Sequence, residues 1–417
     1  MQQRPYRGSG RGGASSRGRT RFTPAERQPR AIPPNLGPET RRITLDDLET
    51  TISDGAADIT DCEYVSSYNL MDDMSKKILV PGRPPLWTPL PHARRIRADA
   101  GTYYRDDNSA RFPDYPYEPV VLSVFQMIPN FDPLSIDVAA CGSTLGSLLR
   151  FVRGIGEPFS CTVQIIGQTL FIIRRELSPQ ALIENVYGFG HAFLEANTTW
   201  SQDVKGSASH QRVIKYQLGA MTVLMRFEAD TYTMDQSDAL EDEEDGVLVN
   251  PASVEDALAD LLVTRRPAAV TDHAEVTLKG ARTSLASLAD VKTRSAKKRL
   301  ESIMSDEIPR LWVRQVQNIV LSFHDKGLFE PPTVQDITSA ILEWEEDNET
   351  AICRLVNLIG QIKEAAIAAR GGKIEVRCED AHSLQFHELS APQADKWNAL
   401  PDDLYERWAP EQEDLAV

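Results

Sequence analysis

Two short stretches of the chain place charged side chains two residues apart inside otherwise apolar segments. The first stretch contains Glu228 and Asp230, and the second contains Asp290 and Lys292. Residues two apart lie on the same face of a β-strand. If the two strands lie side by side in one sheet, three carboxylates and one ammonium group converge on a single place.

Oxygen-rich sites of this kind suit hard divalent cations such as Mg²⁺ or Mn²⁺. A lysine beside them can hold or polarise a water molecule or a phosphate. Each pair alone has an ordinary explanation, since two acids on a strand usually form its solvated face and Asp-x-Lys can be an exposed ion pair. Their succession in two neighbouring strands is typical of nucleases of the Asp/Glu-x-Lys type, in which two metal ions ~4 Å apart bracket a scissile phosphate.

Composition limits the classes of protein to be considered. The 417 residues are 41% hydrophobic and 25% charged, which is enough for one large domain or two ordinary ones. The net charge is −16, although residues 1–42 carry ten arginines against two glutamates. An acidic body disfavours broad adhesion to nucleic acid or membranes. It leaves room for a narrow channel that binds a single strand.

Cysteine usage and hydropathy indicate the cellular compartment. The five cysteines are scattered without a C-x-x-C pair, so we expect neither disulfides nor a zinc site. No apolar run is long enough to cross a membrane, and the N-terminus lacks the apolar core of a signal peptide. These features predict a protein of the nucleus, with the cytoplasm as the alternative, and no membrane partner.

Three regions are expected along the chain. Residues 1–42 form a disordered Arg/Gly-rich tail that either binds RNA loosely or has no required partner. Residues 43–375 form a single nuclease-like domain with an acidic, disordered insertion near 235–250. Residues 376–417 form a C-terminal tail.

The expected fold class is mixed α/β, also described as α+β. A twisted mixed sheet would hold the acidic strands, with helices on its faces and a second, smaller sheet. Alternating apolar runs predict two hairpins, at residues 159–175 and 210–232, and a strand at 286–293. Apolar residues at helical spacing predict a helix at 142–153 and largely helical structure from 333 to 369.

The order of segments from residue 136 to 369 resembles the DXO-type decapping exoribonuclease family, which removes defective 5′ ends from messenger RNA. Glu228-Ala229-Asp230 is similar to its Glu-x-Asp motif, and Asp290-Val291-Lys292-Thr293 to its Glu-Leu-Lys-Thr. Gly190 to Glu195 resembles its Gly-Tyr-Lys-Phe-Glu segment, and Trp312 to Gln315 its Trp-x-x-Gln. The resemblance implies a metal-dependent hydrolase that acts on RNA 5′ ends by decapping, 5′–3′ exonucleolysis, or both, in RNA quality control.

The resemblance also implies roles for individual residues. Two ions, Mg²⁺ or Mn²⁺, would be held by carboxylates, and catalysis would depend on Glu228, Asp230, Asp290 and Lys292. The metal ligands would be Glu195, Glu228, Asp230 and Asp290, with Lys292 positioning the attacking water or the phosphate. Gln315 would contact the nucleotide or a metal-bound water. From its place beside the acidic strand, Arg212 is a second candidate for substrate binding.

This sequence departs from the family's pattern at three positions. Cys141 stands where the family has its opening arginine, one extra residue precedes Glu195, and Asp290 is one methylene shorter than the usual glutamate. A group of fungal proteins with the same core includes some labelled geranylgeranyl diphosphate synthase. The chain has no Asp-Asp-x-x-Asp motif, so it lacks the residues for that chemistry.

The alternative to a hydrolase is a catalytically weakened protein of the same fold that binds RNA, or a partner exoribonuclease, without turnover. The substitutions around Cys141 and Glu195 favour this alternative. The acid pairs and Lys292 favour the hydrolase, because clustered like charges are costly without a cation. A third interpretation is a scaffold unrelated to nucleic acid, in which these charges are ordinary ion pairs.

Overall fold

The computed structural model describes residues 32–48, 57–183, 186, 188–234, 273–298 and 300–410. Most of the Arg/Gly-rich segment and the predicted acidic insertion near 235–250 lie outside these residues. No helix within the described ranges is long and apolar enough to cross a membrane.

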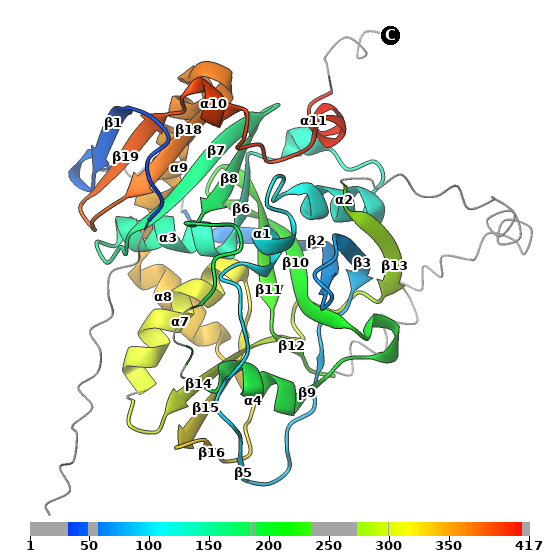
Figure 1. Ribbon diagram of the computed structural model, residues 1–417. Helices are drawn as coiled ribbons and strands as arrows, with labels where there is room; N and C mark the ends of the chain where they lie inside the picture. The colour runs from blue at the N-terminus through cyan, green and yellow to red at the C-terminus, as the bar shows by residue number, and fades with distance from the viewer. Residues whose placement is uncertain are drawn as a thin grey trace, which may run out of the picture.

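Two sheets form the centre of the molecule (Figure 1). The large sheet has the strand order β1 (Glu39–Thr44), β19 (Ser383–Glu388), β18 (Lys373–Cys378), β7 (Phe159–Ile166), β8 (Thr169–Arg175), β6 (Val138–Cys141), β11 (Met221–Ala229), β10 (Ser207–Leu218), β2 (Ile59–Met71), β3 (Lys77–Gly82) and β13 (Glu275–Gly280). The second sheet has the order β5 (Arg94–Arg95), β16 (Leu328–Phe329), β15 (Asn318–Asp325), β14 (Leu288–Ser295), β12 (Thr231–Tyr232), β4 (Leu86–Trp87) and β9 (Thr198–Thr199), with β17 (Gln335–Asp336) paired to β15.

Helices cover both faces of the large sheet. One apolar core lies under α3 (Gly142–Val152), α7 (Leu300–Arg314), α8 (Thr338–Asp347) and α9 (Glu349–Ala368). A second core, on the opposite face, lies under α2 (Glu118–Met127) and α11 (Asp402–Trp408). The shorter helices are α1 (Asp107–Arg111), α4 (Gly190–Asn197), α10 (Ala391–Ala394) and the single turns η1 (Asp46–Leu48), η2 (Pro133–Ser135), η3 (Gln202–Val204) and η4 (Arg370–Gly372).

The predicted fold class is confirmed. The structure is a mixed α+β fold with a large mixed sheet, flanking helices and a smaller second sheet. Both predicted hairpins are present as β7–β8 and β10–β11, and alternation of side chains explains them. In β11, for example, Met225 and Phe227 enter one core while Leu224 enters the other.

One chain segment passes directly from the large sheet into the second sheet. β11 ends at Ala229, and β12 begins two residues later at Thr231. β12 then pairs antiparallel with β14, so that Thr231 lies opposite Ala289. Asp230 is therefore the residue at the crossing between the two sheets, and β14 is brought beside it.

Both predicted boundaries of the nuclease-like domain differ from the structure. Residues 39–42 belong to β1, which pairs with β19 at the edge of the large sheet. Residues 376–410 continue β18 and add β19, α10 and α11, so they are not a tail as far as residue 410. Local patterns do not predict these elements, because their apolar residues are few and are buried only by contacts with distant parts of the chain.

Trp408 is the clearest example of such a contact. Its side chain is buried against Phe125, Phe131 and Phe171, and its indole N–H donates to Thr169 Oγ1 at 3.0 Å. We expect Trp408→Phe to lower the free energy of unfolding by about 1–2 kcal/mol, because it removes this bond and part of the buried ring.

The measurement is a urea unfolding curve compared with that of Tyr405→Phe. Tyr405 lies on the same helix but is exposed, so its loss should cost less than about 0.5 kcal/mol. Equal curves for the two variants would show that α11 does not contribute to the fold.

Candidate active site

The two acidic strands lie in different sheets, so the prediction of one shared sheet is wrong, and they meet only where β11 continues through Asp230 into β12, the partner of β14. Because β12 pairs with β14 immediately after Asp230, the carboxylate of Asp230 reaches the neighbouring strand. Its Oδ2 accepts a hydrogen bond from the backbone N–H of Val291 at 2.8 Å. This bond fixes Asp230 between Asp290 and Lys292, which point to the same side of β14.

An ion-pair network joins the two strands. Lys292 Nζ lies 2.6 Å from Asp290 Oδ2 and 3.8 Å from Asp230 Oδ2. Arg314, the last residue of α7, approaches the other oxygen of Asp290 at 3.0 Å. The network therefore holds two carboxylates and two cations, with Asp290 as the best-neutralised acid.

The electrostatics of the two aspartates differ for this reason. Burial acts to raise the pKa of Asp290, but Lys292 and Arg314 outweigh it, so the pKa lies below its ordinary value. Burial and the neighbouring charge of Asp290 raise the pKa of Asp230, and Lys292 only partly opposes them. Neighbouring cations therefore neutralise Asp230 less completely than Asp290.

Glu228 lies two residues before Asp230 but faces an adjoining cavity. Desolvation and the charges of Asp107 and Asp230 raise the pKa of Glu228 to about 8. Its side chain is still exposed to solvent, so water screens part of this repulsion. Glu228 is thus a carboxylate that would gain from a nearby cation.

Arginines and acids line this cavity, which has a volume of about 160 Å³. Arg226 forms a hydrogen bond to Gln211 Oε1 at 2.8 Å and an ion pair with the nearly buried Asp106 at 3.4 Å. The full lining is Arg105, Asp106, Asp107, Cys141, Gly142, Ser143, Arg174, Gln211, Arg226, Phe227, Glu228 and Arg314. The cavity therefore offers guanidinium groups for an anion directly beside the acid cluster.

Cys141 stands where the resemblance predicts an arginine, and two arginines of neighbouring strands lie close to this position. Cys141 lines the cavity as the N-cap of α3. Arg226 comes from β11 and Arg174 from β8, the strands on either side of β6. The guanidinium groups of Arg174 and Arg226 thus line the same cavity as Cys141.

Arg212 is not brought to the site. It is fully buried, donates to Thr283 Oγ1 at 2.6 Å and stacks over the ring of Tyr64. Its neighbour Gln211 faces the cavity instead, because successive residues of β10 point to opposite faces of the sheet. The prediction therefore identified the correct strand and the wrong face.

Gln315 is also turned away from the acids. Its backbone is left-handed, with φ at 54°, and its side chain donates back to the carbonyl oxygen of Trp312. Arg314, one residue earlier, provides the contact to Asp290. No local pattern signals this exchange, since it depends on where α7 ends.

Glu195 lies exposed on α4, near the Tyr103 ring that stacks on His191. Within the described ranges, no hydrogen bond or ion pair links it to Asp230, Asp290 or Lys292. Its predicted role as a fourth metal-binding carboxylate stays a prediction.

The positions of the carboxylates can be compared with what a Mg²⁺ or Mn²⁺ site requires. Across the part of the chain that the structure describes, no three His, Cys, Asp or Glu side chains converge as a ready metal site. Asp290 is held by Lys292 and Arg314 while Glu228 faces the cavity, so the predicted meeting of three carboxylates around a cation stays a prediction. The donor chemistry nevertheless fits a hard cation, since Asp230 and Glu228 are crowded carboxylates with raised pKa values.

Residues 43–408 match the family described as "Domain of unknown function (DUF8563)", and the chain belongs to that family. No curated protein matches the sequence.

Solved structures share the fold. Rai1 of Scheffersomyces stipitis, in complex with (3′-NADP)⁺ and calcium ion, aligns with a TM-score of 0.56 at 11% identity over 89% of this chain and 98% of that one. S. pombe Rai1 aligns with a TM-score of 0.54 at 10% identity, over 84% and 99%. Candida albicans Rai1, in complex with pU5-Mn²⁺, aligns with a TM-score of 0.51 at 11% identity, over 88% and 98%. The predicted likeness to decapping exoribonucleases is therefore confirmed for the fold.

Proposed function

We propose that this protein is a divalent-cation-dependent hydrolase of RNA 5′ ends, acting by decapping, 5′–3′ exonucleolysis, or both. The observation that carries the proposal is the meeting of Asp230, Asp290 and Lys292 at the crossing between the two sheets. The fold shared with Rai1, including a structure in complex with pU5-Mn²⁺, supports RNA as the substrate. A nuclear location is part of the proposal.

The charged side chains of the site can be assigned roles in this hydrolysis. Asp230, Asp290 and Glu228 would hold the cation, which supplies Lewis-acid stabilisation of the phosphate and a more acidic water. Lys292, held between the two aspartates, would orient the attacking water or a phosphate oxygen. The cavity beside Glu228 would receive the 5′ phosphate, with Arg226 and Arg174 as donors.

The experiment is hydrolysis by the purified protein with Mn²⁺. We expect a 5′-monophosphorylated RNA to be shortened, or a capped RNA to release its cap, and chelation of the metal to stop the reaction. An RNA with a 5′ hydroxyl is the matched substrate without the terminal phosphate. No product from either RNA would refute the hydrolase.

A second candidate is an RNA-binding protein of the same fold without turnover, alone or with a partner exoribonuclease. The specific observation in its favour is that Lys292 and Arg314 together occupy both oxygens of Asp290. Retained RNA binding with no hydrolysis would support this candidate. The predicted exoribonuclease partner stays a prediction.

Metal binding has a readout that does not need activity. At pH 8 we expect Mn²⁺ to raise the melting temperature by about 2–5 °C relative to EDTA. Because the pKa of Glu228 is raised from 4.5 to about 8 in the folded protein, its ionisation costs stability as the pH rises through this range, and a cation offsets that cost. At pH 5 protons compete for the carboxylates, so the shift should be smaller.

The variants Asp230→Asn and Glu195→Gln make this measurement decisive. The first should remove most of the Mn²⁺-dependent shift. The second should remove it only if Glu195 is a ligand, and an unchanged shift in Glu195→Gln would eliminate that residue from the metal site.

A further inference from the structure

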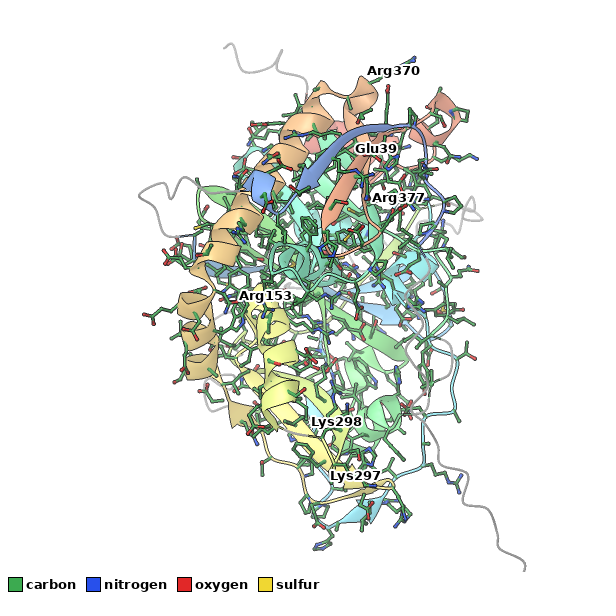
Figure 2. The ribbon with its side chains drawn as sticks, turned by 90° about the vertical axis from the view of Figure 1, so that its left-hand side faces the viewer. Glu39, Arg153, Lys297, Lys298, Arg370 and Arg377 are labelled. Carbon is green, nitrogen blue, oxygen red and sulfur yellow. The ribbon has the colours of Figure 1, made fainter. Side chains whose placement is uncertain are left out.

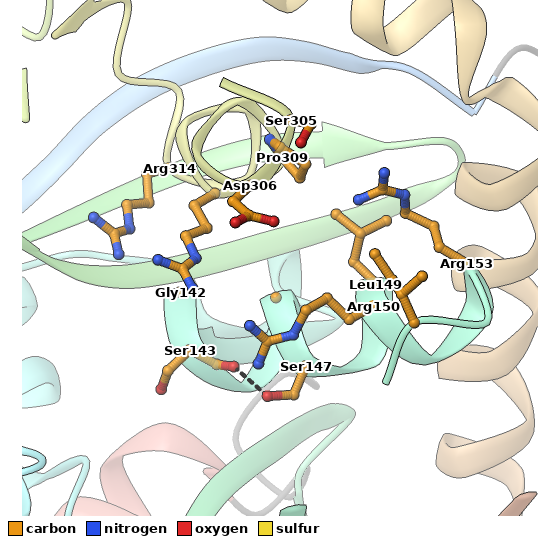
Figure 3. A pocket seen from close by; sticks show the side chains of 13 residues that line it. Gly142, Ser143, Ser147, Leu149, Arg150, Arg153, Ser305, Asp306, Pro309 and Arg314 are labelled. Atoms are coloured by element: carbon orange, nitrogen blue, oxygen red, sulfur yellow. Dashed lines mark hydrogen bonds between the residues drawn. The ribbon is translucent and has the colours of Figure 1, made fainter. Parts of the chain in front are cut away.

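A second cavity, of about 200 Å³, lies between α3 and α7 and adjoins the acidic site. The two cavities share Gly142, Ser143 and Arg314 in their linings. Figure 3 shows Arg150 of α3 across the space from Asp306 of α7, which lies between Arg314 and Arg153. The second cavity, which we call the α3–α7 pocket, therefore adjoins the cavity beside Glu228.

The α3–α7 pocket concentrates positive charge on an acidic protein. Its lining contains Arg150, Arg153, Arg310 and Arg314 against one acid, Asp306, whereas the whole chain has a net charge of −16. Like charges held in one cavity repel each other unless anions join them. The charge of the pocket lining is thus opposite in sign to the net charge of the whole chain.

The arginines of this pocket are only partly compensated by the protein. The structure records no hydrogen-bond partner for the buried Nε of Arg150. Burial, with Arg310, lowers the pKa of its guanidinium, and the charges of Glu157 and Asp306 only partly oppose this. Arg153 lies over the ring of Trp344, and burial lowers its pKa as well. Arg310 is 45% exposed and makes one contact with Glu307 at 3.4 Å, an acid that Arg294 also neutralises.

The surface of α3 leaves room for a ligand. Gly142 and Gly146 lie one turn apart on the pocket side, next to Ser143 and Ser147. A Cβ atom built at Gly146 would meet nothing within 4 Å, so the helix backbone borders open space there. On the face shown in Figure 2, Arg153 lies near the middle, and the exposed Lys297 and Lys298 lie toward one end.

We propose that the α3–α7 pocket binds phosphodiester groups of the RNA strand whose 5′ end lies at the acidic site. Guanidinium groups match phosphate oxygens in shape and charge, and a row of them follows a single strand without reading its bases. This inference rests on the proposed function and extends it, because it gives the strand a direction away from the acid cluster.

The test is fluorescence anisotropy with an eight-nucleotide, 5′-phosphorylated RNA in EDTA, so that no turnover occurs. Arg150→Gln/Arg310→Gln should bind at least about tenfold more weakly than the unaltered protein. The slope of log affinity against log salt should fall by roughly 1.4, which is about 0.7 for each lost contact. Arg150→Lys/Arg310→Lys should keep the slope, and Arg370→Gln, an exposed arginine away from the pocket, should bind like the unaltered protein.

The outcomes separate this inference from the proposed function. Binding of the double Gln variant within twofold of the unaltered protein, with the same slope, overturns the inference even if Mn²⁺-dependent hydrolysis occurs. A large loss of binding with no hydrolysis supports the pocket and refutes the hydrolase. If the unaltered protein does not bind this RNA even at low salt, the inference fails, and the hydrolysis experiment with Mn²⁺ alone decides the proposed function.

The inference can still be tested if the double Gln variant folds poorly. Arg150 is half-buried, so melting curves accompany each variant. Arg310→Glu changes a side chain that is 45% exposed, removes its contact with Glu307 and reverses its charge. It should weaken binding at least as much as the loss of one contact, and unchanged binding in this variant would also count against the pocket.

Discussion

Asp230→Ala is expected to reduce Mn²⁺-dependent hydrolysis of RNA by at least about a thousandfold. The substitution removes the carboxylate that the Val291 N–H and Lys292 hold beside Asp290. It also leaves Lys292 with Asp290 as its remaining partner in the network, so the ammonium group loses its central position. The rate of release of nucleotide or cap under single-turnover conditions is the measurement.

Two further variants separate catalysis from folding. Asp230→Asn keeps an oxygen that accepts from Val291, so it should fold like the unaltered protein and still be inactive. Glu63→Ala removes another carboxylate that pairs with a lysine, Lys215 at 3.2 Å, but Glu63 is largely exposed on β2. Normal activity in Asp230→Ala would show that the site has been assigned wrongly.

The largest expected loss of stability lies at the other end of the large sheet. Glu375 on β18 is fully buried and accepts hydrogen bonds from Arg175, Arg377, Ser160 and the backbone N–H of Leu36. Glu375→Ala leaves two buried guanidinium groups without their shared carboxylate. We expect the free energy of unfolding to fall by about 3–5 kcal/mol in urea titrations.

Glu379 provides the matched control. It also pairs with Arg377, at 3.1 Å, but its side chain is 59% exposed. Glu379→Gln should therefore cost no more than about 1 kcal/mol. Similar losses in the two variants would mean that burial does not govern the strength of this cluster.

The Glu375 cluster also explains how the N-terminal segment is anchored. Arg377 donates to the carbonyl oxygen of Pro33 and Arg175 to that of Pro34, close to the Leu36 N–H bond. We expect Glu375→Ala to expose residues 33–36 to proteases more than Glu379→Gln does.

The sequence predicted those parts of the fold that local patterns determine. The hairpin at residues 159–175 and the helix beginning at residue 142 are found where alternating or helically spaced apolar residues placed them. The neighbouring positions of Asp230 and Asp290 were likewise predictable, because both stretches carry charged residues at a spacing of two within apolar runs. These features depend on a few consecutive residues.

The remaining parts of the site depend on contacts between distant residues. Asp106 meets Arg226 across 120 positions of sequence, and no local pattern marks either residue as part of the cavity. Arg212 was predicted in place of Gln211, and Gln315 in place of Arg314, since a shift of one residue reverses the face of a strand or passes the end of a helix. Sequence spacing identified the elements but not these orientations.

The passage of one segment through both sheets has a consequence for how the protein unfolds. β11 and β12 are separated by Asp230 alone, so the second sheet cannot detach without pulling on the last strand residues of the large sheet. We therefore expect the two sheets to melt in one cooperative transition. A fluorescent probe beside either sheet should report the same unfolding midpoint. Glu375→Ala should therefore lower the midpoint measured beside Asp230 as well.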